Sequence, residues 1–232
     1  MLQFIKYIYK FIFHLFGINL RVLFSLYKFP KYIKDLITFK LYGGSINSIF
    51  PILYDYNDNA GNIKSQYFHQ DLHVSSLIYQ NKPINHIDVG SRIDGFVSNI
   101  SVFMKVDVMD IRKLEIKKKN INFKRGDITN KEFNNKLKYM SVSCLHSIEH
   151  FGLGRYDDPV NPNGHIIGFN NLYKLLDEGA LLYLSFPVSS RKRIEFNAHR
   201  VFGFLDIFDW MYDLNIKDLE LISFDLIDDK SN

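Results

Sequence analysis

The sequence predicts an α/β fold, in which helices cover a Rossmann-like, doubly wound and mostly parallel sheet. Three observations lead to this fold class. Short apolar runs recur along residues 84–187, helical stretches separate several of them, and polar residues with glycines gather where the runs end. Strands that alternate with helices pair in parallel, and the carboxyl ends of such strands form the rim of a ligand site.

Residues 1–44 are expected to form an amphipathic helical extension, followed by a catalytic domain over residues 45–232. The extension holds seven Lys and Arg against one Asp, although the whole chain has a formal net charge of only +4. Its polar residues recur at helical spacing, and breaks are expected near residues 17–19 and at Pro30. These polar residues are Gln3, Lys6, Lys10, His14, Gly17, Arg21, Ser25 and Lys28.

The basic, aromatic-rich extension has two interpretations. A helix of this kind can lie on an anionic bilayer, which predicts peripheral membrane contact through residues 1–40. The same pattern suits a helical cap packed on the domain. No uncharged run reaches the roughly 18 residues of a membrane-spanning helix, and nucleic acid is not an expected partner because no basic face continues into the catalytic half. The single cysteine, Cys144, fits a cytoplasmic protein, with the inner face of the membrane as the docking place.

A helix over residues 68–79 is expected to precede the first strand, since its apolar residues recur at helical spacing. The stretch 84–95 then predicts a buried strand that ends in a glycine-containing acidic loop. Glycine permits close backbone approach, and a helix start offers free N–H groups to a ligand. The candidate cofactor-binding residues of this loop are Asp88, Gly90, Ser91, Asp94 and Gly95.

Three further strands are expected, each followed by polar residues. The second ends in Asp110, 20 residues after Gly90, and about 20 residues is the spacing at which a Rossmann unit places its ribose-binding acid. The third leads into Asp127, and the fourth into His146. Their predicted bounds are 104–112, 121–125 and 140–145.

The carboxyl-terminal part is expected to contain a helix at 164–177, a fifth strand at 179–187, a helix at 200–214 and a strand at 218–227. The second strand of a terminal hairpin is expected to be missing, which makes the hairpin incomplete. An unpaired strand edge invites pairing with another chain, so a homo-oligomer is among the expected partners.

The order Asp-Val-Gly-Ser-x-x-Asp-Gly, then an acid that ends the second strand, then Gly-Asp-Ile and Ile-Glu-His, resembles class I S-adenosylmethionine-dependent methyltransferases. More narrowly, residues 87–95, 144–164 and 193–202 resemble an uncharacterised methyltransferase-like family met in surface-polysaccharide gene clusters. The resemblance covers roughly residues 50–228. It implies S-adenosylmethionine as cofactor and methyl transfer to a sugar hydroxyl of a surface polysaccharide or its precursor.

The places of the strand-end residues assign each of them a role. Gly90 is expected at the methionine end of the cofactor, Asp110 at the ribose and Asp127 at the adenine edge, with His146 nearby. A hydroxyl acceptor needs a base, and histidine titrates near neutrality. We expect His150 as that base, with His199 second, His146 third and Glu149 as a further catalytic candidate. The loops after the fourth and fifth strands supply the candidate substrate-binding residues Arg155, Tyr156, Asp158, Glu195, Asn197 and Arg200.

Two other functions stay open. Ser91 and Arg92 replace the small residues of the usual Gly-x-Gly loop, which keeps a non-catalytic methyltransferase-like subunit of a membrane-associated polysaccharide assembly as the alternative. His146, Glu149 and His150 also match an inverted zinc-peptidase pattern, which requires all three on one helix. A zinc hydrolase is therefore a minor alternative, whereas the leading interpretation assigns no metal.

Overall fold

The computed structural model describes residues 24–56, 65–134 and 136–228. The contacts within the chain divide it into two units, residues 1–62 and residues 63–232. The units part after residue 62, whereas the sequence placed the boundary after residue 44.

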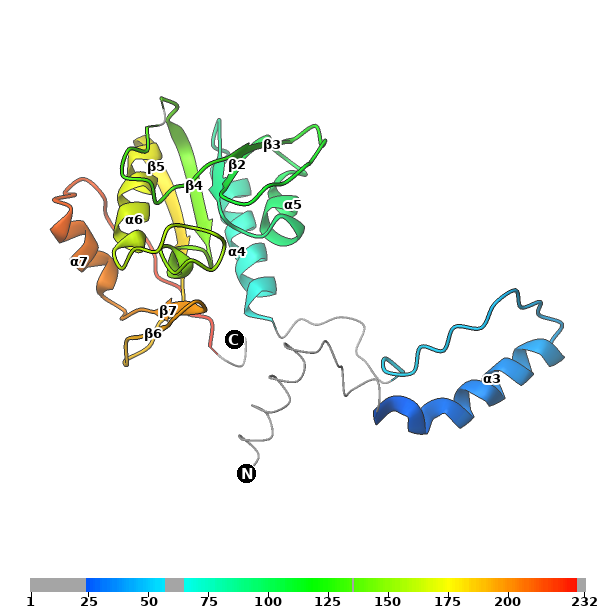
Figure 1. Cartoon of the computed structure of the whole chain (residues 1–232). Helices are drawn as coiled ribbons and strands as arrows, with labels where there is room; N and C mark the ends of the chain where they lie inside the picture. Colours follow the sequence, from blue (N-terminus) through cyan, green and yellow to red (C-terminus); the bar gives the residue numbers. More distant parts are fainter. Residues whose placement is uncertain (1–23, 57–64, 135, 229–232) are drawn as a thin grey trace. The chain divides into compact units, whose positions relative to one another are not determined.

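The first unit contains a short 3-10 helix, Ser25–Lys28, that leads into helix α3, Phe29–Leu41 (Figure 1). Pro30 lies in the first turn of α3, where its missing N–H interrupts no intrahelical hydrogen bond, so it marks the start of a helix. The predicted polar positions before residue 24 lie outside the described residues. Within the described part of the chain, no helix combines the length and the apolar character that crossing a bilayer requires.

The second unit is built on a five-stranded parallel sheet with the order β3-β2-β1-β4-β5. Ile87 of the central strand pairs with Asp107 on one side and with Val142 on the other. The chain adds strands first on one side of β1 and then on the opposite side, so a topological switch point lies between β1 and β4. The strands are β1 Ile87–Val89, β2 Val106–Asp110, β3 Ile121–Arg125, β4 Tyr139–Leu145 and β5 Leu176–Ser185.

Helices cover both faces of this sheet, as Figure 1 shows. Successive side chains of a strand point to opposite faces, so the sheet separates two apolar cores. Val108 of β2 packs in the core that contains residues of α4 and α5, whereas its neighbour Met109 packs in the core with residues of α6 and α7. The predicted Rossmann-like arrangement is thereby confirmed. The helices are α4 Gln66–Asn81, α5 Ser98–Ile100, α6 Gly164–Leu175 and α7 Asp206–Asp213, with a π-helical turn at Ile93–Val97.

The alternation of strands and helices is incomplete. Residues 111–120, between β2 and β3, and the described residues between β3 and β4 form only turns, irregular chain and one isolated bridge. The run Lys117–Lys119 leaves the first of these connections without a continuous apolar face, and a helix in a globular domain needs such a face for its packing.

The carboxyl-terminal prediction was wrong in two respects. Residues His199–Val201 form β7, which pairs antiparallel with β6, Arg193–Glu195, so the following helix α7 begins only at Asp206. The expected strand at 218–227 is not formed, because no strand of the described residues pairs with this segment and a lone strand gains no ladder hydrogen bonds. Because this strand is not formed, the structure gives no support for an unpaired strand edge at residues 218–227 or for self-association through it.

Candidate functional site

A cavity of about 380 Å³ lies at the carboxyl ends of β1, β2 and β4. Its lining includes Gly90 after β1, Asp110 at the end of β2 and His146 after β4. Open α/β sheets bind their ligands at such a switch point, and small-molecule sites have volumes of roughly 300–1,000 Å³. The cavity therefore lies where the sequence placed the ligand site.

Gly90 turns the chain sharply away from β1. Its φ of 75° is in the left-handed region that favours glycine. A Cβ atom here would come within 2.2 Å of Ser147 Oγ, so a larger residue would displace the loop after β4. The Gly90 N–H donates to the Met109 carbonyl at 2.9 Å, which ties the loop to β2. This part of the cavity wall is consequently open backbone.

Asp88 supports the glycine loop from inside the sheet and does not line the cavity, which corrects its predicted role in cofactor binding. Its buried carboxylate accepts hydrogen bonds from Ser91 N–H at 3.1 Å, Ser91 Oγ at 2.5 Å and Ser143 Oγ at 2.6 Å. Burial raises the pKa of Asp88 to about 6, although these hydrogen bonds oppose the shift. Ser91 does line the cavity, but its hydroxyl also accepts from the Leu145 N–H at 3.0 Å.

Asp94 and Gly95, also predicted to bind cofactor, lie outside the cavity lining because the chain winds into the π-helical turn at Ile93. Asp94 is exposed and pairs with Arg92 at 2.9 Å, and this hydrogen-bonded contact lowers the pKa of Asp94. Gly95 instead permits close packing on α4, since a Cβ atom there would come within 2.5 Å of Asp71 Oδ2. Both residues shape the loop.

Asp110 and Asp127 both line the cavity. Arg112 holds Asp110 in a bidentate ion pair, with 2.9 Å between Nε and Oδ1 and 2.5 Å between Nη2 and Oδ2. This hydrogen bonding to Asp110 raises the pKa of Arg112. Asp127 Oδ1 accepts from the N–H and the hydroxyl of Thr129 at 2.8 and 2.7 Å. A ligand diol would therefore compete with Arg112 for the Asp110 carboxylate.

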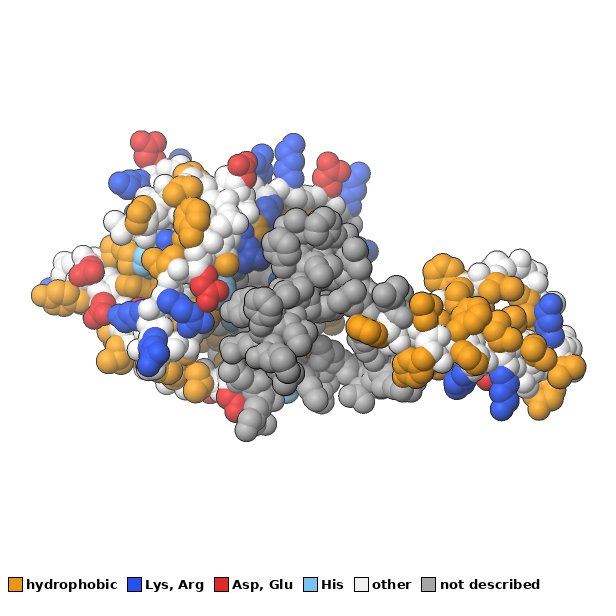
Figure 2. Space-filling view, turned by 60° about the horizontal axis from the view of Figure 1, so that its bottom comes forward, with side chains coloured by type: hydrophobic (Ala, Val, Ile, Leu, Met, Phe, Trp, Pro, Cys, Tyr) orange, Lys and Arg blue, Asp and Glu red, His pale blue; other side chains and the backbone are white. Residues whose placement is uncertain are grey.

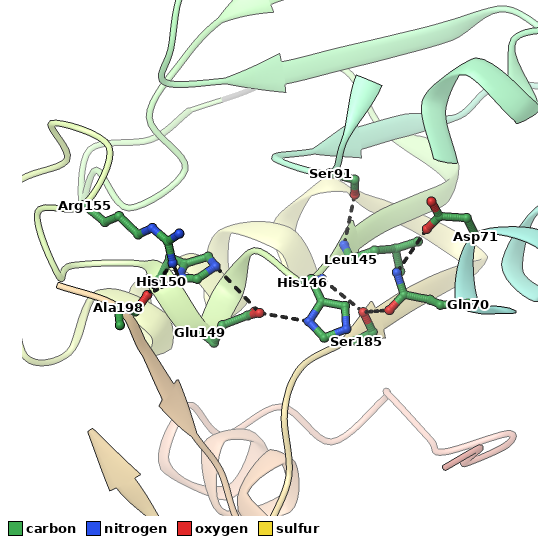
Figure 3. A network of polar contacts seen from close by, with 10 residues as sticks. All are labelled: Gln70, Asp71, Ser91, Leu145, His146, Glu149, His150, Arg155, Ser185 and Ala198. Carbon is green, nitrogen blue, oxygen red and sulfur yellow. Dashed lines mark hydrogen bonds and ion pairs between the residues drawn. The ribbon is translucent and has the colours of Figure 1, made fainter. Parts of the chain in front are cut away.

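Buried Glu149 lies between His146 and His150 (Figure 3). Its Oε1 is 3.0 Å from His146 Nδ1 and 3.8 Å from His150 Nε2. A carboxylate can only accept, so His146 Nδ1 donates to it. The second oxygen, Oε2, is buried and has no hydrogen-bond partner among the described residues. The site thus holds an unused acceptor atom beside two imidazoles.

The tautomer of His150 follows from its contact with the Ala198 carbonyl. The His150 Nδ1 lies 2.6 Å from that oxygen, which has no proton to give, so Nδ1 carries the hydrogen. Burial lowers the pKa of His150, although Glu149 and the Ala198 carbonyl favour its charged form. Neutral His150 therefore presents the lone pair of Nε2. If Nε2 takes up a proton, the Glu149 carboxylate at 3.8 Å stabilises the imidazolium.

A chain of hydrogen bonds links this group to α4 (Figure 3). The backbone N–H of His146 donates to the carbonyl and to the hydroxyl oxygen of Ser185, at 3.1 and 3.0 Å. The Ser185 hydroxyl donates to Gln70 at 2.5 Å, and Gln70 donates to Asp71 at 3.2 Å. Burial raises the pKa of Asp71. Gln70 and Asp71 line the cavity, whereas His73 of the same helix is exposed.

The loop between His150 and α6 contributes Arg155 and Tyr156 to the cavity lining, where substrate-binding residues were expected. The Tyr156 ring centroid is 4.5 Å from the Arg112 guanidinium carbon and 5.2 Å from that of Arg155. Arg155 Nη1 also donates to the Ala198 carbonyl at 2.9 Å. The same carbonyl thus orients both His150 and Arg155.

Asp158 and Arg200 hold this loop in shape. Asp158 lines the cavity, but its carboxylate accepts hydrogen bonds from three backbone N–H groups of the loop, at 2.8 to 3.2 Å. Arg200 is buried outside the lining and donates to two backbone carbonyls, of Phe151 at 2.5 Å and Pro162 at 3.2 Å. Burial lowers the pKa of Arg200. The predicted substrate contact of Arg200 is corrected, because its side chain lies outside the cavity lining and both Nη groups donate to the backbone.

The hairpin β6–β7 places only one of its predicted site residues at the cavity. His199 lines it, with its ring centroid 6.5 Å from that of His150. Glu195 and Asn197 are exposed and lie outside the lining, which corrects their predicted substrate contacts. The cause is the turn of the hairpin, where Asn197 has a φ of 63° and Glu195 pairs with Arg193 at 2.9 Å.

The geometry contradicts the zinc-hydrolase alternative. His146 has a φ of 49°, which no helical residue has, and only Ile148–His150 form a single 3-10 turn. The peptidase pattern needs both histidines on one face of a helix. In the parts of the chain that the structure describes, no cluster of three His, Cys, Asp or Glu could hold a metal ion.

Arg112 and Tyr67 are among the cavity residues that were not predicted from the sequence. Arg112 carried a usable signal, since it lies two residues after the acid that ends β2 and is therefore within reach of it. Tyr67, whose ring centroid is 4.8 Å from that of His146, gave none, because only the tertiary packing of α4 brings it to β4.

Solved structures share this fold at low sequence identity. The 1,6-didemethyltoxoflavin-N1-methyltransferase of Burkholderia thailandensis, solved with S-adenosylhomocysteine, is 9% identical with a TM-score of 0.50, over 73% of this chain and 82% of that chain. CalS10, an amino pentose methyltransferase from Micromonospora echinaspora solved with S-adenosylmethionine, is 14% identical with a TM-score of 0.40, over 60% and 58%. The N-methyltransferase NodS of Bradyrhizobium japonicum is 14% identical with a TM-score of 0.38, over 57% of this chain and 65% of NodS. The chain spans about three fifths of CalS10 and NodS. The likeness to the Burkholderia enzyme shows a methyltransferase-like fold.

No curated protein matches the sequence. A family model does match, under the description "Caenorhabditis protein of unknown function, DUF268", over residues 97–218. The matched segment runs from the π-helical turn through β2 to β5 and the β6–β7 hairpin, and it includes His146, Glu149 and His150. The narrower likeness to a polysaccharide gene-cluster family stays a prediction. Because the match covers more than half of the sequence, the chain belongs to the DUF268 family.

Proposed function

We propose that the protein is an S-adenosylmethionine-dependent O-methyltransferase that acts on a sugar hydroxyl of a surface polysaccharide or its precursor. The support for methyl transfer is the methyltransferase-like fold together with a cavity at its switch point. The support for a hydroxyl acceptor is the chemistry of the residues after β4.

The residues at the strand ends fit the cofactor. Gly90 offers open backbone, and Asp110 and Asp127 present carboxylates at the next two strand ends, so these three would hold S-adenosylmethionine. When bound, the cofactor supplies an activated methyl group on a positively charged sulfur. Both Asp110 oxygens already accept hydrogen bonds from Arg112, so ribose hydroxyls would compete with this guanidinium for the carboxylate.

The observation that carries the proposal is the state of His150. Its Nδ1 hydrogen is fixed by the Ala198 carbonyl at 2.6 Å, so the unprotonated Nε2 is the atom available to a ligand. Burial lowers the pKa of His150, which keeps the ring neutral and able to accept a proton at physiological pH. A neutral hydroxyl is a poor nucleophile, and such a base removes its proton as the new bond forms. Glu149 then stabilises the charged ring.

The acceptor chemistry follows from the remaining polar atoms. Glu149 Oε2 lacks a partner among the described residues and would accept a hydrogen bond from a second hydroxyl of the substrate. Tyr156 and Arg155 offer a ring face and a donor at the same cavity. A sugar presents several hydroxyls and an apolar ring face to such a set, which is why we favour it as the acceptor.

Binding of S-adenosylhomocysteine by calorimetry tests the cofactor, and His150→Gln tests the base. His150→Gln is expected to leave S-adenosylhomocysteine affinity within about two-fold and to lower methyl transfer to a sugar acceptor by about 100- to 10,000-fold. His199→Gln is the matched control, since it changes the neighbouring imidazole at the same cavity. If His199→Gln produced the larger loss, the two roles would be exchanged. Absence of S-adenosylhomocysteine binding to the wild-type protein would refute the cofactor assignment.

The pair of Arg112 with Asp110 favours a second candidate, a non-catalytic methyltransferase-like subunit of a membrane-associated polysaccharide assembly. In this alternative the pair is permanent and closes the ribose position. A protein that binds sugar but neither S-adenosylmethionine nor S-adenosylhomocysteine would fit this second function.

A further inference from the structure

We propose that residues 24–56 form a docking surface for an anionic lipid bilayer. This inference goes beyond the proposed methyl transfer and does not depend on it. Helix α3 has no buried residue, although most of its side chains are apolar. Figure 2 shows apolar side chains over much of this part of the chain, with lysines along its margin.

The two faces of α3 differ in the way that an interfacial helix requires. At 100° per residue, the apolar Phe29, Tyr32, Ile33 and Leu36 fall on one face, whereas Lys31, Lys34 and Thr38 fall on the opposite face. Lys40, in the last turn, falls on the apolar face, and its long side chain can reach the headgroups from there. Helices with this division lie in the plane of a bilayer surface, with their apolar face among the acyl chains and their lysines at the headgroups. A helix of 13 residues is about 20 Å long, too short to span the roughly 30 Å hydrocarbon layer.

The chain that follows α3 extends the apolar surface. Leu41, Tyr42 and Phe50 are 79%, 88% and 80% exposed, which is high for side chains of this size. Exposed apolar surface of this extent marks an interaction site, and aromatic side chains with a polar tip, such as tyrosine, favour the headgroup region. The surface therefore has the composition of a membrane interface over both the helix and the segment behind it.

The distribution of charge selects a bilayer over other partners. Residues 1–62 contain seven Lys and Arg against three Asp, whereas residues 63–232 contain 22 of each sign. The whole net charge of +4 is thus carried by the first unit. Of its described lysines, Lys31 is paired with Asp35, whereas Lys34 and Lys40 have no carboxylate partner in the described residues. Apolar side chains beside unpaired lysines complement a bilayer, whose acyl chains are apolar and whose headgroups are anionic.

Flotation of the full chain with lipid vesicles tests this proposal. The protein is expected to float with vesicles that contain phosphatidylglycerol, to bind pure phosphatidylcholine vesicles weakly, and to be released from the former by salt, because surface charges are screened. This salt titration uses the wild-type protein, so it stays informative if a variant folds poorly. A wild-type protein that remains in the soluble fraction with both lipids would overturn the proposal.

Matched variants separate charge from apolar contact. The charge variant combines Lys28→Gln, Lys34→Gln and Lys40→Gln, and it should lower the partition coefficient about five-fold per lysine. The apolar variant combines Phe39→Ser, Leu41→Ser and Phe50→Ser, and it should abolish flotation. The control variant combines Ile84→Ser, Val102→Ser and Tyr212→Ser, which change equally exposed apolar side chains of the second unit.

The control variant is expected to float like the wild-type protein. Equal losses in the control and the apolar variant would show non-specific adhesion and overturn the proposal. Light scattering without lipid provides the last check. A dimer that becomes monomeric in the apolar variant, with no flotation of the wild type, would instead assign the surface to contact with a second copy of the chain.

Discussion

Replacing Arg112 with glutamine should tighten the binding of S-adenosylhomocysteine. In the structure Arg112 occupies both oxygens of Asp110 and also lies 4.5 Å from the centre of the Tyr156 ring. The ribose of a bound cofactor would compete with this guanidinium for the Asp110 carboxylate. Arg112→Gln removes the competitor and leaves the carboxylate in place.

The size of the effect follows from the exposure of the pair. The Arg112 side chain is 48% exposed and that of Asp110 is 12% exposed. A half-exposed ion pair is screened by water, so we take the upper end of the range for exposed pairs, about 1 kcal/mol, for its bidentate geometry. Loss of the cation–π contact adds about 0.5 kcal/mol. The sum corresponds to an affinity gain of roughly ten-fold.

Isothermal calorimetry with S-adenosylhomocysteine measures this gain directly. Arg193→Gln is a matched control, since Arg193 pairs with exposed Glu195 outside the cavity, and it should leave the affinity unchanged. Asp110→Asn should weaken binding by about 1.5–3 kcal/mol, because hydrogen bonds to a charged group are lost. If Arg112→Gln weakened binding or left it unaltered, Arg112 would not compete with the ligand for the Asp110 carboxylate.

Three further predictions concern the site and the stability of the sheet. For His150→Gln, the plot of log kcat against pH should lose the acid limb that titration of the wild-type base produces below neutrality, and a limb that persisted would exclude His150 as that base. Burial lowers the pKa of His86 to about 3, so below pH 6.5 this histidine takes up a proton in the unfolded chain but stays neutral in the folded chain. The free energy of unfolding, measured with urea, should therefore fall by about 2 kcal/mol between pH 7.5 and 5. Because the raised pKa of Asp88 acts in the opposite direction by about 1 kcal/mol, the measure is the difference in pH dependence between wild type and His86→Gln, and equal slopes would contradict the assignment. Gly168→Ala should destabilise the protein by about 1–3 kcal/mol in thermal unfolding despite the better helix propensity of alanine, since its Cβ would come within 2.4 Å of the Phe151 ring, and a stabilised variant would show that the ring moves aside freely.

The position of Asp110, at the end of β2, could be predicted from the sequence, but its ion pair could not. The 20-residue spacing from Gly90 placed Asp110 at the cavity, because a parallel sheet brings the ends of neighbouring strands together. The spacing carried no information on whether the carboxylate is free. Arg112 decides that point through its side-chain conformation, which the order of residues does not specify.

What the sequence determined by itself was the class of fold and the edge of the sheet where polar residues meet. Runs of apolar residues near β1, β2, β3 and β4 have the length of strands, and burial of those runs leaves few other arrangements. The sequence did not show that Asp88 and Asp94, unlike Gly90, lie outside the cavity. Asp88 is buried inside the sheet, and the Asp94 side chain points into solvent.

Only the tertiary structure decided which groups act together around Glu149. The His150 tautomer depends on the carbonyl of Ala198, 48 residues away along the chain, and the His146 N–H depends on Ser185 of the neighbouring strand. The start of α7 was also predicted too early from the helical spacing of residues 200–214. Residues 199–201 instead pair with Arg193–Glu195 in the hairpin β6–β7. Hydrogen bonds between distant segments outweigh local propensity, which differs between helix and strand by only about 1 kcal/mol per residue or less.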